Sequence, residues 1–503
     1  MADIVLATLN AKYAHTAFGL RYLHANLGAL RDRAEILEFH INERPIDILE
    51  VLLAAAPRVV GLGVYIWNVA QTEAVVGLLK AVRPDITVVL GGPEVSHETA
   101  GQRIVALADH VVVGEGEAVF PGLCQQLLEG APPAARVLPS TLPDLTRLAL
   151  PYHLYTDVDL AQRVVYVEAS RGCPYACEFC LSSLDVSVRR VDLGRFLAAM
   201  DDLLRRGARQ FKFIDRTFNL HLSTSQAILE FFWERYTPEL FLHFEMVPDR
   251  LPEGLRETIA RFPPGALQFE VGIQTFDSAT EKRISRRQNH LKLRDNLTFL
   301  KAATGVHVHA DLIVGLPGES MESFGRGFDT LVALGPQEIQ VGILKRLRGT
   351  PLGRHTAAFG MVYGPEPPYE ILCNDAYSFA AMQRMKRFAR YWDMIANRGT
   401  FRLTTPLIWG AGSPFDGFMR LSDWLWGCTG QTHAIALDRL AELLLNFLCH
   451  QVGVDEALAT QALREDYSRG AARRTPPFLV PQATLTRPRK ARNLPRRQAQ
   501  HLA

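Results

Sequence analysis

Three closely spaced cysteines constrain this chain more than any other feature. Cys173, Cys177 and Cys180 lie in the run Arg-Gly-Cys-Pro-Tyr-Ala-Cys-Glu-Phe-Cys. A cubane [4Fe-4S] cluster takes one thiolate for each iron, so three thiolates leave one iron open to another ligand. A structural zinc site would need a fourth Cys or His at short spacing, and the next such residue is His221. The spacing therefore favours an iron–sulfur cluster over zinc.

Length and composition bound the class of protein. A chain of 503 residues is too long for one hydrophobic core, and length alone predicts about three domains. Hydrophobic residues make up 48% and charged residues 21%, which is typical of a globular protein in water. No apolar run is long enough to span a membrane, and the N-terminus has no basic region or cleavage site, so neither a membrane partner nor export is expected. Seven cysteines, three of them clustered, form no disulfide framework, which predicts a cytoplasmic protein.

The C-terminal tail carries the excess of positive charge. From Arg473 to Ala503 there are eight Lys and Arg and no Asp or Glu, which leaves 47 basic and 53 acidic residues elsewhere. Because five prolines accompany these charges, residues 471–503 are expected to form a disordered basic tail. A solvated tail is favoured over a nucleic-acid contact, since no aromatic side chains are interleaved to stack on bases. No nucleic-acid partner is therefore expected.

Residues 1–135 alternate short β-branched runs with amphipathic stretches. This alternation predicts an α/β domain with a doubly wound parallel sheet and helices on both faces. The expected strands are 4–8, 35–39, 59–64, 87–90 and 110–113, and the expected helices are 18–30, 46–55, 69–82, 98–108 and 119–128. Ligands of such sheets bind beyond the carboxyl ends of the strands.

Glycine-rich loops follow several of these strands, at the edge where a ligand is expected. The run Gly61-Leu-Gly63 lies at the end of a strand, and Gly91-Gly92 and Gly114-Glu-Gly116 each follow one. Glycine leaves room for a ligand against the backbone, so a large ligand is expected here. No Gly-x-Gly-x-x-Gly run follows the first strand, which argues against a nicotinamide or flavin dinucleotide.

Residues 160–350 repeat the alternation of strands and helices. The expected strands are 164–168, 210–214, 240–245, 266–273, 307–314 and 338–344. Six such units fit a partial (β/α)6 barrel, whose functional side chains lie at the carboxyl ends of the strands. Residues 136–159 are expected to be a linker. Residues 365–470 are expected to form a helical C-terminal domain with an aromatic core, including helices over 369–397 and 433–452.

The cysteine run resembles the signature of radical S-adenosylmethionine (SAM) enzymes. Phe179 places an aromatic residue before the third cysteine, an apolar strand precedes the run, and Gly315-Leu-Pro-Gly-Glu319 follows further along the chain. The N-terminal layout resembles the cobalamin-binding domain of one branch of that superfamily, in which runs like Gly91-Gly-Pro-Glu94 and Gly114-Glu-Gly-Glu117 recur. The resemblance covers residues 1 to 350. It implies three cofactors, namely a [4Fe-4S] cluster, SAM and cobalamin.

The same resemblance implies residues for each cofactor. The cluster ligands would be Cys173, Cys177 and Cys180. The implied SAM contacts are Phe179, Asp215, Glu245, Glu270, Gln274, Gly315, Pro317 and Gly318. The implied cobalamin contacts are Asn10, Tyr13, His15, Tyr65, Trp67, Asn68, Gly91, Gly92, Pro93, Glu94, Gly114, Glu115, Gly116 and Glu117. No catalytic residue is predicted.

Several of these assignments have competing explanations. Asp215 ends an expected barrel strand, where a carboxylate suits the SAM amino group, but a helix N-cap would also explain it. Glu270 lies in an otherwise apolar strand, where an acidic side chain is costly unless it faces a polar site or a partner. The lower axial ligand of cobalt is left open, because the Asp-x-His-x-x-Gly run of many cobalamin enzymes is absent. His15 is a candidate, against a hydrogen-bonding or surface role.

The function implied by the resemblance is a cobalamin-dependent C-methyltransferase. In that family, SAM cleavage yields a 5′-deoxyadenosyl radical that abstracts hydrogen from an unactivated carbon, which then receives methyl from cobalamin. The expected partners are a small-molecule or peptide substrate and an external electron donor such as flavodoxin or ferredoxin. One alternative is a cobalamin-dependent radical cyclase or rearrangement enzyme. Another is a non-catalytic iron–sulfur protein for electron transfer or sensing.

Overall fold

The computed structural model describes residues 2–469, 476 and 479. The predicted basic tail, residues 471–503, therefore lies outside the described residues except at two positions. The described chain divides into two compact units. The first runs up to Arg216 and includes Lys345–Gly353 and Gly364–Glu370, and the second comprises Thr217–Leu344, Arg354–Tyr363 and the chain from Ile371 onward. This division falls within residues 160–350, which the sequence predicts as one domain.

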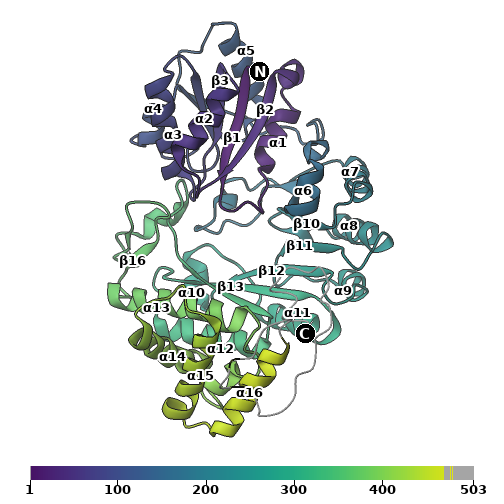
Figure 1. The fold of residues 1–503 in the computed structure, drawn as a ribbon. Coiled ribbons are helices and arrows are strands. Elements are labelled where there is room, and N and C mark those ends of the chain that lie inside the picture. The colour runs from purple at the N-terminus through teal and green to yellow at the C-terminus, as the bar shows by residue number, and fades with distance from the viewer. Residues whose placement is uncertain (1, 470–475, 477–478, 480–503) are drawn as a thin grey trace. The chain divides into compact units, whose positions relative to one another are not determined.

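A six-stranded parallel sheet forms the N-terminal part of the first unit, in the strand order β2-β1-β3-β4-β5-β6. Figure 1 labels its strands β1, β2 and β3. Its strands are β1 (Ile4–Asn10), β2 (Ala34–His40), β3 (Val59–Gly63), β4 (Thr87–Gly91), β5 (His110–Val113) and β6 (Val137–Pro139). The register aligns Thr8 of β1 with Gly63 of β3, and Gly63 with Gly91 of β4. The carboxyl ends of the central strands therefore meet at one edge of the sheet.

Helices cover both faces of this sheet, and each face has its own core. One face packs against α2 (Pro45–Ala54), α3 (Val69–Val82) and α4 (Arg103–Leu107), and the other against α1 (Phe18–Ala25), η1 (Gly28–Arg33) and α5 (Phe120–Leu128) (Figure 1). Successive strand residues alternate between the two, since Val5 and Ala7 join the core under α2–α4 while Ile4 and Leu6 join the core under α1 and α5. The doubly wound fold that the sequence predicts for this region is confirmed. The core under α2–α4 is the larger of the two.

The edge strand β6 is not predicted by the sequence, which assigns residues 136–159 to a linker. β6 pairs with β5 in parallel register, yet Val137 is exposed and Pro139 has no backbone N–H to donate. The same segment holds helix α6 (Asp157–Gln162), whose N-cap Thr156 accepts a hydrogen bond from the backbone of Asp159. The segment thus contains regular structure that its residue pattern does not reveal.

The strands expected for the barrel are present in both units. In the first unit β7 (Val165–Val167) pairs in parallel with β10 (Gln210–Phe213), and a short antiparallel ribbon is formed by β8 (Ser170–Arg171) and β9 (Arg189–Arg190). In the second unit β11 (Phe241–Met246), β12 (Leu267–Gln274), β13 (His307–Val314) and β14 (Glu338–Ile343) are parallel neighbours in that order. The helices between them are α7 (Leu193–Arg205), α8 (Leu222–Glu234), α9 (Glu253–Ala260), α10 (Ser278–Arg283), α11 (His290–Ala303) and α12 (Met321–Leu334).

The C-terminal region is helical, as expected, and its long helices are α13 (Phe379–Trp392), α14 (Pro414–Thr429), α15 (Leu437–Phe447) and α16 (Glu456–Arg469). The expected helix 369–397 begins only at Phe379, because Ser378 caps it and strand β16 (Ile371–Cys373) precedes it. The Trp392 ring packs edge to face with Phe328 and with Phe418 in an aromatic core, at centroid distances of 4.7 and 4.9 Å. No helix among the described residues is long and apolar enough to cross a membrane.

Candidate functional site

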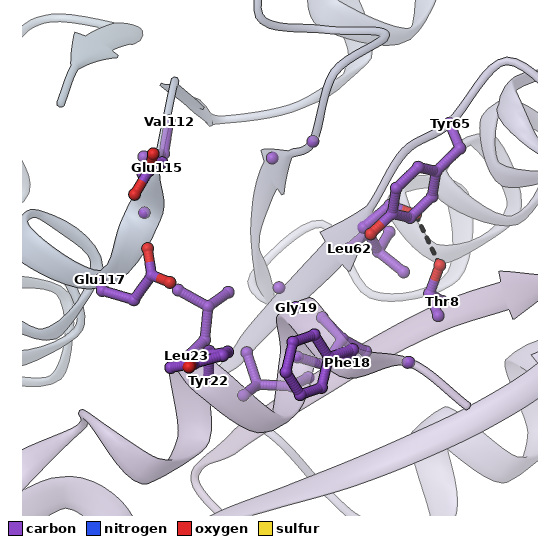
Figure 2. A pocket seen from close by; sticks show the side chains of 18 of the residues that line it. Thr8, Phe18, Gly19, Tyr22, Leu23, Leu62, Tyr65, Val112, Glu115 and Glu117 are labelled. Carbon is purple, nitrogen blue, oxygen red and sulfur yellow. Dashed lines mark hydrogen bonds between the residues drawn. The ribbon is translucent and has the colours of Figure 1, made fainter. Parts of the chain in front are cut away.

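A cavity of about 640 Å³ lies in the first unit, at the carboxyl ends of β1, β3, β4 and β5 (Figure 2). Phe18 and Leu23 of α1 and Leu62 of β3 contribute apolar wall, whereas Glu115 and Glu117 supply carboxylates (Figure 2). Thr8 Oγ1 donates a hydrogen bond of 2.7 Å to the carbonyl oxygen of Gly63, which ties two strand ends together at the rim. The cavity occupies the place where doubly wound sheets bind their ligands.

Backbone rather than side chain forms part of the cavity wall. Gly92 has φ +105°, and a Cβ atom added there would lie 2.5 Å from the carbonyl oxygen of Val64. A Cβ on Gly61 would lie 3.0 Å from Cδ2 of Leu6. Only glycine fits at position 92, because both its φ angle and its close backbone neighbour exclude a side chain. The glycines that the sequence analysis identified therefore bring the chain close to the cavity.

Most of the predicted cobalamin contacts line this cavity. They are Asn10, His15, Tyr65, Trp67, Gly91, Gly92, Gly114, Glu115, Gly116 and Glu117. Two groups of lining residues were missed by sequence reasoning. One is on helix α1, including Phe18 and Tyr22, and the other follows strand β7, including Glu168 and Arg171. An acidic and a basic residue between an apolar strand and the cysteine run were the signal that could have identified the second group.

The remaining predicted contacts lie outside the cavity lining, namely Tyr13, Asn68, Pro93 and Glu94. The Asn68 amide donates hydrogen bonds of 3.0 Å to Leu9 O and 3.1 Å to Gly63 O. It therefore connects the ends of β1 and β3 from outside the cavity lining. The Glu94 carboxylate accepts hydrogen bonds of 2.6 Å from the Tyr369 hydroxyl and 2.8 Å from Arg348. Both side chains support the loops of the cavity.

His15 lines the cavity and already has a partner on one ring nitrogen. Its Nδ1 atom lies 2.6 Å from the hydroxyl oxygen of Tyr166 on β7. Burial lowers the pKa of His15, and the positive charges of Lys212, Lys12 and Arg163 lower it further. A neutral imidazole is therefore favoured, which is the form that coordinates metals. Its role as an axial ligand stays a prediction.

The three cysteines of the run lie on one loop between β8 and the 3-10 turn Leu181–Leu184. Cys177 is buried, Cys173 and Cys180 are partly exposed, and none of them forms a disulfide. Burial raises the pKa of the Cys173 thiol, and the proximity of Cys180 and Cys177 raises it further. Three free thiols on one loop are the donor set that a [4Fe-4S] cluster with one open iron requires. Among the described residues no group of three His, Cys, Asp or Glu side chains is arranged to hold a single metal ion.

Asp215, predicted to receive the SAM amino group, is buried after the end of β10. Its carboxylate accepts hydrogen bonds from the backbone N–H of Ala169, at 3.0 and 3.2 Å, and from Ser170 Oγ, at 2.6 Å. Burial raises the pKa of Asp215 to about 6, although these hydrogen bonds act in the opposite direction. Asp215 therefore fixes the residues that lead into the cysteine run.

Buried and partly buried charges connect the cavity with the base of the cysteine loop. The Arg171 cluster, as we name it, consists of Arg171, Arg189, Glu115, Glu117, Glu168 and Asp185. Arg171 lies 2.7 Å from Glu115, 2.8 Å from Glu117 and 2.8 Å from Glu168. Burial raises the pKa of Glu168 to about 7, against the lowering effect of Arg171. Two guanidinium groups thus face four carboxyl groups at the edge of the cavity.

One face of strands β11 to β14 in the second unit is polar. The register aligns Glu245 with Glu270, Glu270 with His309, and His309 with Glu338. Nε2 of His243 lies 3.1 Å from Oε2 of Glu270. Inward positions of such barrels are usually filled by branched apolar side chains, so this row of acids and imidazoles suits a polar ligand. Gln274 has φ +73° where the register shifts, which turns the chain at the end of β12.

The Gly315-Leu-Pro-Gly-Glu319 turn follows β13 and is tightly packed. Gly315 has φ +90°, and an added Cβ would lie 2.8 Å from Cγ2 of Ile371. Glu319 is buried, and its Oε1 accepts a hydrogen bond of 2.5 Å from Thr275. Its other oxygen, Oε2, has no hydrogen-bond partner among the described residues. Burial raises the pKa of Glu319 to about 7, so this carboxyl group retains its proton well above its usual range.

Glu319→Gln is expected to remove part of the pH dependence of stability. Between the unfolded pKa of 4.5 and the folded pKa of about 7, the native state holds a proton that the unfolded state has lost. This group therefore stabilises the fold at low pH and loses that contribution, about 3 kcal/mol at most, as pH rises through this window. Urea denaturation of cofactor-free protein at pH 5, 6, 7 and 8 measures the effect.

The matched control for this prediction is Glu322→Gln. Glu322 lies in the first turn of α12 and is fully exposed, with a pKa lowered by hydrogen bonds to its own backbone and to Ser320. Its replacement should leave the slope between pH 5 and 7 unchanged. An equal slope in wild type and Glu319→Gln would mean that Glu319 is ionised in the fold.

Three families match the chain. The B12 binding domain matches residues 4–124, and the Radical SAM superfamily matches residues 167–331. A protein family of unknown function (DUF4080) matches residues 357–501. The first match covers the sheet that carries the cavity, and the second begins at the end of β7 and includes the cysteine loop. These matches agree with the cofactors that the sequence predicts.

Curated relatives include the cobalamin-dependent radical SAM methyltransferase TokK of Streptomyces tokunonensis. The chain is 26% identical to it over 322 residues, which is 57% of this chain and 47% of TokK. The chain thus spans about half the length of TokK and of a second curated methyltransferase that it matches.

Solved structures with a similar fold include OxsB, a cobalamin-dependent SAM radical enzyme with aqua-cobalamin and SAM bound. The match has a TM-score of 0.62 at 13% identity and covers 92% of this chain and 83% of OxsB. The methyltransferase TsrM from Kitasatospora setae, with cobalamin and a [4Fe-4S] cluster bound, matches with a TM-score of 0.58 at 17% identity, over 73% of this chain and 78% of TsrM. These likenesses confirm the predicted fold class, with a parallel-sheet N-terminal domain, a radical SAM domain and a helical C-terminus.

Proposed function

Because this chain belongs to the radical SAM enzymes that carry a B12-binding domain, we propose that it transfers a methyl group from cobalamin to an unactivated carbon of its substrate. The observation that carries the proposal is the arrangement of the first unit. There, a glycine-walled cavity at the strand ends and a loop with three free thiols are connected by the Arg171 cluster. The curated relative TokK, a methyltransferase of this kind, supports methylation over other radical outcomes.

The residues of the cavity fit cobalamin in shape and chemistry. Glycines at positions 91, 92, 114 and 116 allow a large planar ligand to approach the backbone. Glu115 and Glu117 face the cavity as hydrogen-bond acceptors, which suit the amide groups at the edge of a corrin ring. His15, neutral and held at Nδ1 by Tyr166, is the imidazole in this lining. We propose that these side chains hold and orient the ligand.

The cysteine loop and the polar face of β11–β14 complete the proposed machinery. Cys173, Cys177 and Cys180 would hold the cluster, and Asp215 fixes the backbone just before their run. Glu245, Glu270, Gln274 and the turn at Gly315, Pro317 and Gly318 are proposed to bind SAM, as Phe179 beside the cluster is. When bound, the cluster and SAM supply a carbon radical and cobalamin supplies a methyl group. The protein's part is to place these groups and to exclude water.

The proposed reaction also needs an electron donor, a reducing compartment and a substrate. The cluster needs an external electron donor, such as a flavodoxin or ferredoxin. The cysteines are all free in the described residues, which suits a reducing compartment such as the cytoplasm. The substrate is proposed to be a small molecule or peptide with polar groups, since the barrel face formed by β11–β14 is lined with acids and imidazoles.

Anaerobic reconstitution with iron, sulfide and cobalamin, followed by reduction in the presence of methyl-labelled SAM, tests the function. The proposal expects formation of 5′-deoxyadenosine together with transfer of the label to a carbon of a substrate. Formation of 5′-deoxyadenosine without label transfer, with the substrate cyclised or rearranged, would favour the rearrangement alternative. Bound cluster with no 5′-deoxyadenosine would identify an electron-transfer or sensing protein.

A further inference from the structure

Arg171 has an unusual set of contacts for a residue two positions before a predicted cluster ligand. Its side chain is 14% exposed, and its guanidinium pairs with Glu115, Glu117 and Glu168 at 2.7 to 2.8 Å. It also lies over the ring of Tyr22, 4.5 Å from the ring centroid. Glu115 and Glu117 belong to the Gly114–Glu117 loop of the B12-binding domain, which also contains Tyr22. Glu168 and Arg171 belong to the region predicted as the barrel. Arg171 therefore lines the cavity and lies two residues before Cys173.

The link from Arg171 to Cys173 is stiff. Gly172 has φ +91°, and a Cβ on it would lie 1.9 Å from the carbonyl oxygen of Ser187, so the chain here lies against the segment that leads into β9. The backbone N–H of Cys173 donates a hydrogen bond of 2.9 Å to Asp185 O. Arg189, opposite Arg171 in the β8–β9 ribbon, pairs with Glu115 and with Asp185. A displacement of Arg171 is thus carried to Cys173 by covalent and hydrogen-bonded connections.

A ligand in the cavity would change the surroundings of these charges. Glu115, Glu117, Glu168 and Arg171 all line the cavity, and Glu115 is still 23% exposed. A ligand that fills the cavity removes water from the Arg171 cluster, and ion pairs strengthen as the local dielectric falls. Amide donors on the ligand would also hold in place the Glu115 and Glu117 carboxylates, with which Arg171 forms ion pairs. Either effect reduces the freedom of the β8–β9 ribbon from which the cysteine loop starts.

Given the proposed function, on which this inference rests, we propose that Arg171 is a positioning residue that makes cobalamin binding and cluster loading strengthen each other. Coupling of this kind is reciprocal, so each cofactor raises the affinity for the other by the same factor. Partly burying two guanidinium groups and four carboxyl groups has an energetic cost that is otherwise unexplained, since apolar side chains could pack this junction as well. Arg171 acts through the loop and does not itself ligate the cluster.

Equilibrium dialysis with cyanocobalamin, with bound cobalt measured by mass spectrometry, tests the coupling. Wild-type protein should bind cyanocobalamin about tenfold more tightly after anaerobic cluster reconstitution than before it. In Arg171→Gln the two dissociation constants should become equal, although both cofactors still bind. A ratio that remains at the wild-type value in a folded, cluster-loaded Arg171→Gln protein would overturn the inference, and so would a ratio of one in wild type.

Arg21→Gln is the matched control. Arg21 is another buried arginine of the same unit, 2.6 Å from Glu38 and 2.8 Å from Asp159, but it does not line the cavity or precede the cysteines. Its loss should lower stability while keeping the tenfold ratio. If Arg171→Gln does not fold, Glu117→Gln takes its place, since it removes one carboxylate facing the cavity and retains Arg171. The ratio should then fall below the wild-type value, and an unchanged ratio would count against the inference.

A second readout does not depend on the cluster. In cluster-free protein, cyanocobalamin should slow the alkylation of Cys173 by iodoacetamide about fivefold in wild type and in Arg21→Gln, but not in Arg171→Gln. Peptide mass spectrometry measures the rate at that cysteine. A protein that binds no cyanocobalamin in any form would contradict the proposed function itself. Binding without any change in affinity or alkylation would contradict only the role of Arg171.

Discussion

Replacing Cys177 with alanine is expected to abolish 5′-deoxyadenosine formation, while cobalamin still binds with the affinity of cluster-free wild-type protein. Cys177 is the buried member of the cysteine trio, and the loop holds only three thiols for a cluster that needs all three. The loop itself should survive, because its hydrogen bond between Cys180 N and Cys177 O uses backbone atoms that alanine retains. The measurements are the iron and sulfide content after reconstitution, the yield of 5′-deoxyadenosine and the amount of bound cobalamin.

The control for this result is Cys428→Ala. Cys428 is an exposed cysteine on helix α14, outside the loop, so its replacement should change neither iron content nor 5′-deoxyadenosine. A Cys177→Ala protein that still holds a full cluster would show that another side chain ligates the third iron. The assignment of the cysteine run as the cluster site would then be wrong. Loss of cobalamin binding in the same variant would instead indicate that the loop had collapsed.

Replacing Gly92 with alanine is expected to destabilise the first unit and to weaken cobalamin binding. At φ +105° a side chain is strained, and the new Cβ would lie 2.5 Å from Val64 O, a backbone atom that cannot move without disturbing the end of β3. Strain of this kind costs about 1–3 kcal/mol, and the steric overlap adds to it. Urea denaturation followed by circular dichroism measures the loss of stability, and dialysis measures the affinity for cyanocobalamin.

Gly77→Ala provides a control of opposite sign. Gly77 lies in the middle of α3, and a Cβ added there meets nothing within 4 Å. Alanine favours the helix by about 1 kcal/mol relative to glycine, so this variant should be slightly more stable than wild type and bind cobalamin equally well. If Gly92→Ala were as stable as Gly77→Ala, the tight backbone contact at the cavity would have to be much looser than described.

Residue patterns predicted the strands of both sheets because burial leaves a local signature. The run Ile4–Asn10 is apolar on both sides of the strand and was predicted as Ile4–Thr8, and His307–Val314 was predicted in full. β6 was not predicted, because it is an exposed three-residue edge strand that includes a proline. The start of α13 was placed too early because residues 369–397 were interpreted as one helical pattern, whereas Ile371–Cys373 form a short strand and Ser378 caps the helix.

The candidate site was predictable where a motif is local and unpredictable where partners are distant. The cysteines and the glycine loops were recognised from short runs. Glu94 was assigned to cobalamin because it belongs to such a run, but its partner Arg348 is 254 positions away in the sequence. Arg171 was visible beside Cys173, whereas its pairing with Glu115 depends on a contact across 56 positions. Residue patterns in a single sequence are local, so they do not indicate ion pairs between residues this far apart.

The two faces of the N-terminal sheet have apolar cores of unequal size. The face that carries the cavity is held by the smaller apolar core, under α1 and α5, while the opposite face has the larger one. While the cavity is empty, fewer apolar side chains hold α1 and α5 against this face of the sheet than hold α2–α4 against the other. A ligand bound in the cavity would then add its binding free energy to the stability of this half of the sheet.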